Sequence, residues 1–171
     1  MPEKLCKKKH LTSFQLIILG FAGVILLGTF LLMLPFSSVN KVQTSFHEAL
    51  FTATSAVCVT GLVVKDTVSY WSPIGQAIIL VLIQTGGLGV VTVAASVSLF
   101  SGKKISLMQR STMKDAISAP KVGGIVRLTR FILKGTMLIE TAGAVLLLPV
   151  FLSDYGLKGI WMSVFHYVSA F

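Results

Sequence analysis

Charged residues are scarce in this chain, and acidic ones are the scarcest. Only 12% of the 171 residues are charged, with six Asp or Glu against fifteen Lys or Arg, whereas hydrophobic residues make up 54%. The mean hydropathy of +0.85 lies outside the range of soluble globular domains. This composition indicates a membrane protein whose natural partner is the lipid bilayer.

Reactive side chains are also few. The two cysteines, Cys6 and Cys58, face different environments and do not form a disulfide framework. No Ser/His/Asp set, metal-ligand spacing or phosphate-binding loop is present, so we expect no enzyme, no bound cofactor and no metal site formed by clustered side chains. The lysines flank apolar segments and are not interleaved with exposed aromatic residues, which argues against a nucleic-acid partner.

Three long apolar segments carry the excess of hydrophobic residues. Residues 14–34 and 72–100 contain no charge, and 131–152 contain only Lys134 and Glu140. A helix rises about 1.5 Å per residue and the hydrocarbon core is about 30 Å thick, so each segment is long enough to cross it. The sequence therefore predicts an all-α polytopic membrane protein with spans at 14–36, 72–100 and 131–152.

The distribution of basic residues predicts the orientation of these spans. Residues 1–10 and 101–134 are rich in Lys and Arg, whereas residues 37–70 contain two lysines and two acidic residues. The positive-inside rule places the basic N-terminus, 1–13, and the loop that begins at residue 102 in the cytoplasm. We expect this loop to cover 102–126, with basic residues up to 130 on the cytoplasmic side of the cell membrane.

The segment between the first two spans is too apolar for a simple loop. Phe51–Val64 is free of charge but short for a span, which is typical of a re-entrant element. With Thr44 or Ser45 as N-cap, a helix over 46–57 would be roughly 18 Å long, about half the membrane. The β-branched, glycine-ended stretch 58–61 is expected to leave the helix and extend.

Non-helical backbone at membrane depth is tolerated only where it is buried in protein or lines an aqueous path. Rings of backbone carbonyls can replace the hydration shell of an alkali cation. The preceding half-length helix would end at the same depth, with the negative end of its dipole directed at the cation. We therefore predict that the carbonyls of Cys58, Val59, Thr60 and Gly61 form an ion-selectivity filter. The alternative is a re-entrant loop that only plugs a helical bundle.

An internal repeat supports the pore interpretation. Leu50–Val57 and Val164–Phe171 share one pattern: an apolar residue, Phe, three variable residues, Ser-Ala and an apolar residue. The same offset of 114 superposes Leu34-Pro35 on Leu148-Pro149. Two anchors in one register predict tandem helix–pore loop–helix repeats.

The first repeat would cover 14–101 and the start of a second 127–171. The half-length helix of the second would run over about 159–171, and the chain would stop before its filter. A glycine is then expected four residues beyond Phe171 in a longer parent chain.

Several further residues have two interpretations each. Asp66 could concentrate cations at the outer mouth or cap the next helix. Gln84 could hydrogen-bond across helices or face the pore, and Glu140 could be a structural hydrogen-bonded group or influence permeation. Gly86 and Gly87 are expected to allow close helix packing.

Five sequence stretches together resemble the membrane subunit of the Ktr/Trk/HKT superfamily of potassium transporters, and most of all the bacterial Ktr-type pore subunit. The resemblance covers essentially the whole chain and rests on these motifs: Ala49–Ala56 with Thr60–Leu62, Val64–Thr67, Gln84–Gly89, Gly102–Ile105, and Phe165–His166 with Ser169–Phe171.

The resemblance implies four tandem repeats around one pseudo-fourfold pore for potassium uptake, of which this chain would be an N-terminal fragment. It further implies a homodimer of pore subunits and a cytosolic nucleotide-binding regulatory ring. Potassium would be the substrate, and sodium coupling is left open. Gly61 is similar to the potassium-selecting version, since sodium-selective plant relatives tend to carry serine there. A subunit of a simple tetrameric cation channel and a non-transporting membrane scaffold are the alternatives.

Overall fold

The computed structural model describes residues 12–90, 92–93, 111–115, 125–156 and 158–170. The named elements in this part are helical: α1 (Ser13–Met33), the 3-10 turn η1 (Pro35–Ser37), α2 (Phe46–Val57), α3 (Thr67–Tyr70), α4 (Pro73–Gly87), α7 (Ile125–Tyr155) and α8 (Lys158–Ala170). Within these described residues the only β-type pairing is an isolated bridge between Ser38 and Trp71. The prediction of an all-α fold is confirmed.

Two of these helices are long and apolar enough to cross a membrane, namely Phe14–Met33 of α1 and Val126–Ser153 of α7. Their apolar side chains are largely exposed, with Phe14 71% and Leu146 77% accessible. Apolar surface of this extent is what lipid covers in a membrane protein. Helix α1 begins in a capping box, in which Thr12 accepts from the Gln15 backbone N–H and the Gln15 side chain accepts from that of Thr12.

Helix α4 is shorter than the predicted span 72–100. It begins at a Ser72 N-cap followed by Pro73, a favourable pair for a helix start. It ends at Gly87, and Gly89 adopts a positive φ of 81°. Closely spaced glycines lower helix propensity and allow left-handed backbone, which accounts for the end of α4 before the end of the predicted span. Residues 91 and 94–100 of the predicted span lie outside the described residues, so its full extent stays a prediction.

The other helix bounds lie close to the predicted ranges. Helix α2 covers the same twelve residues as the predicted half-length helix, and α8 differs by one residue at each end. Helix α1 ends at Met33 because Pro35 begins a separate 3-10 turn, and α7 is longer than predicted at both ends.

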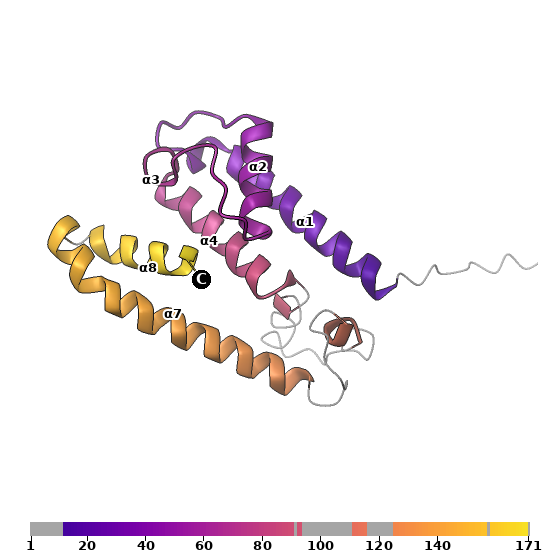
Figure 1. Ribbon diagram of the computed structural model, residues 1–171. Coiled ribbons are helices and arrows are strands. Elements are labelled where there is room, and N and C mark those ends of the chain that lie inside the picture. Colours follow the sequence, from indigo (N-terminus) through magenta and orange to yellow (C-terminus); the bar gives the residue numbers. More distant parts are fainter. Residues whose placement is uncertain (1–11, 91, 94–110, 116–124, 157, 171) are drawn as a thin grey trace, which may run out of the picture.

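The best-packed part of the fold surrounds α2. This half-length helix lies between α1 and α4 and turns Ala49, Ala53 and Ala56 inward, so that its neighbours can approach closely. Helix α8 folds back along α7 and also contacts α4 (Figure 1). Helix α4 is therefore the element that contacts both half-length helices, α2 and α8.

Candidate ion-conducting site

The backbone after α2 turns sharply. Cys58 has φ −84° and ψ 0°, Val59 has φ +53° and Gly61 has φ +71°. The chain leaves the helix after Val57 as predicted, but Val59 and Gly61 do not adopt the extended backbone that was expected of 58–61. A positive φ is unusual for a β-branched residue and costs of order 1–3 kcal/mol, so the surrounding structure must hold Val59 in place.

Ser55 of α2 is the residue that holds this segment. The Thr60 backbone N–H donates to the Ser55 carbonyl at 3.0 Å, and the Thr60 hydroxyl donates to the Ser55 hydroxyl at 3.0 Å. The Ser55 hydroxyl in turn donates to the Leu62 carbonyl at 2.6 Å. From the sequence, Ser55 belonged to a motif but had no predicted role; its recurrence as Ser169 in the second copy was the available signal.

The carbonyl oxygens of the predicted filter are free to bind something else. In the described part of the chain, no donor hydrogen-bonds the carbonyl of Cys58, Val59, Thr60 or Gly61. Unpaired carbonyls at membrane depth are costly unless water or a cation satisfies them. This backbone therefore has the chemistry that an alkali-cation site requires.

A cavity of about 360 Å³ lies beside this segment. Val59, Thr60 and Gly61 line it, whereas Cys58 does not and instead caps α2 with an exposed thiol. Both half-length helices contribute walls, with Ser55 and Ala56 from α2 and Ser169 and Ala170 from α8. These four residues are two pairs related by the offset of 114. Two equivalent parts of the repeat thus face one cavity.

Helix α4 supports the segment from behind through Gly86. A Cβ on Gly86 would lie 2.0 Å from the carbonyl oxygen of Val57, the last residue of α2. A Cβ on Gly87 would meet no described atom within 4 Å; Gly87 instead lines a second cavity of about 80 Å³ with Val59 and Gln84. Close packing is therefore confirmed for Gly86 and stays a prediction for Gly87.

Two glutamines of α4 connect this helix to α7 and α8. The Gln84 amide donates to the Glu140 carboxylate, which brings together two residues that were predicted separately. This contact fits a structural role for both, although Gln84 also borders the small cavity beside Val59. An influence of Gln84 or Glu140 on permeation stays a prediction.

Gln76 makes the second of these connections, which was not predicted from the sequence. Its buried amide donates to the carbonyls of Thr67 and Trp71, each at 3.2 Å. The indole N–H of Trp161 in α8 donates to its oxygen at 2.7 Å. The available signal was an amide side chain in an otherwise apolar stretch, but its partner could not be read from the sequence.

Asp66 lies at the start of the short helix α3. Its carboxylate accepts from the Ser69 backbone N–H at 3.0 Å and from the Ser69 hydroxyl at 2.5 Å. The hydroxyl and then the backbone bond of Ser69 stabilise the charged form and lower the pKa of Asp66 below its usual value. The residue is thus an N-cap, and a role at the outer mouth stays a prediction.

Replacing Asp66 with Asn separates these two roles. An amide oxygen still caps Ser69 but carries no charge, so we expect Asp66→Asn to keep wild-type uptake and Asp66→Ala to lose thermal stability. Because the pKa of Asp66 is lowered, the stabilising charge is fully present above the usual pKa and is lost only in acid, so neither effect should change between pH 6 and 8. A raised KM for the cation in Asp66→Asn would instead support the mouth role.

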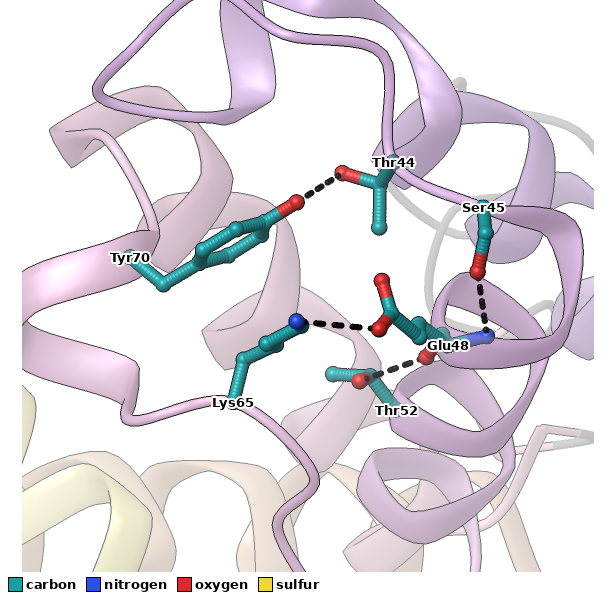
Figure 2. Close-up of polar contacts among 6 residues, drawn as sticks. All are labelled: Thr44, Ser45, Glu48, Thr52, Lys65 and Tyr70. Carbon is teal, nitrogen blue, oxygen red and sulfur yellow. Dashed lines mark hydrogen bonds and ion pairs between the residues drawn. The ribbon is translucent and has the colours of Figure 1, made fainter.

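Charged and hydroxyl side chains gather near the other end of α2, as Figure 2 shows. The Lys65 ammonium lies 3.0 Å from the Glu48 carboxylate and 5.4 Å from the centre of the Tyr70 ring. The hydroxyls of Tyr70 and Thr44 are 3.2 Å apart. The hydrogen bond to Glu48, more than any other contact, raises the pKa of Lys65, so this side chain is charged at physiological pH.

Long exposed apolar helices with half-length helices packed beside them define an α-helical membrane protein. The TrkH family, described as a cation transport protein, matches residues 3–171, and the chain belongs to this family. The match confirms the predicted relationship to this family.

Named relatives agree with the family. The chain is 44% identical over 165 residues to the potassium/sodium uptake protein NtpJ of Enterococcus hirae, which covers 96% of this chain and 37% of that protein. It is 38% identical over 170 residues to the Ktr system potassium uptake protein B of Bacillus subtilis, covering 99% of this chain and 38% of that protein. The protein of the same name from Vibrio alginolyticus is 36% identical over 158 residues, 92% of this chain and 34% of that protein. The chain thus spans less than two fifths of these relatives.

Proposed function

We propose that this chain is part of the membrane subunit of a potassium uptake system, and that Cys58–Gly61 contribute one of its selectivity filters. The observation that carries the proposal is the cavity beside this segment, into which equivalent Ser-Ala pairs of α2 and α8 face. Pseudosymmetric walls around unpaired carbonyls are the arrangement expected of a pore built from repeats. The names of the relatives, which are uptake proteins for potassium or for potassium and sodium, support the choice of ion.

The proposed organisation follows the repeat. Residues 14–101 form the first helix–pore loop–helix unit and 127–171 begin the second, with α2 and α8 as the two pore helices. The lysine and arginine distribution supports a cell-membrane protein with residues 1–13 and 102–130 on the cytoplasmic side and 37–70 outside.

The partners of this chain are also part of the proposal. Two of the named relatives are named as proteins of a Ktr system, and a system implies a membrane subunit that works with other proteins. We propose a homodimer of pore subunits with a cytosolic nucleotide-binding ring on the inner face. Whether sodium moves together with potassium is a separate question, which flux measurements would answer.

Growth of a potassium-uptake-deficient bacterial strain tests the function. Expression of the full-length parent protein is expected to restore growth at low potassium and to give saturable uptake of rubidium, a tracer for potassium. A membrane scaffold would give no flux. A simple tetrameric channel would predict that the unit 1–101 alone conducts, whereas the tandem-repeat pore needs the linked repeats. No uptake by a well-expressed, correctly inserted parent protein would refute the proposal.

A further inference from the structure

The chain that follows the filter segment runs back along one face of α2. It is attached to α2 first by the hydrogen bonds of Thr60 and Leu62 with Ser55, and then by the salt bridge between Lys65 and Glu48. Glu48 and Ser55 are two helical turns apart and share a face of α2. The segment is thus attached to α2 near residues 58–61 and again near the N-terminus of α2.

The second tie places a fixed positive charge near the cavity. Val63 and Thr67, on either side of Lys65 in the sequence, both line the cavity that Val59–Gly61 border. A free ammonium group there would repel a cation on its way to the carbonyls. The ammonium group is instead paired with Glu48 and packed over Tyr70, whose hydroxyl lies beside that of Thr44 (Figure 2).

No other described acidic residue between residues 37 and 70 forms a salt bridge with Lys65. Asp66 is engaged by Ser69, and the described salt bridge of Lys65 is to Glu48. Glu48 is itself oriented at the first turn of α2, where its backbone N–H donates to the Ser45 hydroxyl at 3.5 Å. Lys65 and Glu48 are about one third exposed, so their field reaches the water at the mouth.

We propose that Glu48 is a positioning residue that holds the Lys65 ammonium aside and neutralises its field, and that this pair sets the apparent affinity for the incoming cation. The proposal rests on the proposed function and adds a determinant of affinity outside the filter. Its distinctive consequence is that the two partners act in opposite directions. Removing Glu48 exposes a positive charge, whereas removing Lys65 exposes a negative one.

The experiment measures rubidium uptake by the full-length protein, normalised to the amount of protein in the membrane. Glu48→Gln is expected to raise KM roughly three- to fivefold, the size expected of one partly screened charge, and Lys65→Gln to lower it by a similar factor. The double variant should return KM close to the wild-type value, and Lys65→Arg should leave it unchanged. The shifts should shrink in about 0.5 M choline chloride, on the order of the salt at which the Debye length falls to a few ångströms.

Each outcome decides the proposal. If both single variants change KM in the same direction, or change only the amount of protein, the pair is merely structural and the proposal is overturned. If Glu48→Gln does not accumulate in the membrane, the fall in KM of Lys65→Gln and its loss in high salt still test the charge effect. No uptake by the unsubstituted protein would overturn the proposed function as well, whereas normal uptake with unchanged KM in both single variants overturns this proposal alone.

Discussion

Gly86→Ala is expected to abolish selective uptake. The new Cβ would lie 2.0 Å from the Val57 carbonyl oxygen and 2.9 Å from the Val57 α-carbon, so it overlaps backbone and not the end of a flexible side chain. Helix α4 or the last turn of α2 must then move. Overpacking of this kind costs typically about 1–3 kcal/mol, and here it displaces the residue directly before Cys58.

The matched control is Gly87→Ala, one residue further along α4. Its Cβ meets no described atom within 4 Å and enters the edge of the small cavity beside Val59, so protein amount and uptake should stay near wild type. Rubidium uptake with and without excess sodium, together with the amount of protein in the membrane, measures both. Equal loss in the two variants would mean that helix propensity, and not the approach to Val57, explains the effect.

Gly61→Ser is expected to weaken the discrimination between potassium and sodium while the protein still inserts. Gly61 has φ +71°, and a Cβ added to it would meet no described atom within 4 Å, so a serine fits among these residues but must adopt left-handed backbone, at a cost of roughly 1–2 kcal/mol. Relief of that strain would turn the neighbouring carbonyls. Since each 1.4 kcal/mol is about a factor of ten, a shift of this size in one of several filters should be visible as sodium-sensitive growth at low potassium.

Gly23→Ser serves as control for this second variant. Gly23 lies inside α1 without a positive φ, and a Cβ added to it would meet no described atom within 4 Å. This substitution should leave sodium sensitivity unchanged. Unaltered potassium uptake and sodium sensitivity in Gly61→Ser would contradict the assignment of the filter to Cys58–Gly61.

Local signals explain which parts of the fold could be predicted. The bounds of α2 follow from a Ser45 cap and from the end of helical propensity at the β-branched residues after Val57, both of which act within a few residues. The general location of the candidate filter follows from the same pattern. The order of half-length helix and following loop was visible because the sequence repeats it.

Features of the fold that depend on residues far apart in the sequence could not be predicted from it. The positive φ of Val59 is imposed by the bonds of Ser55 to Thr60 and Leu62, and no propensity favours it. Which of the two adjacent glycines packs against α2 depends on the rotation of α4, and a shift of one residue turns a helix by about 100°. The end of α4 at Gly87 was missed for a different reason, since uniform apolar composition conceals a helix break.

The contacts of Gln76 have an optical consequence. The two tryptophans of this chain, Trp71 and Trp161, both hydrogen-bond this one amide, the first through its carbonyl and the second through its indole. Trp71 directly precedes Ser72, the N-cap of α4, whereas Trp161 belongs to α8. The intrinsic fluorescence of these residues therefore reports on the junction between α4 and α8 without an added label. Separation of α8 from α4 would break the indole hydrogen bond, expose Trp161 further and shift its emission to longer wavelength.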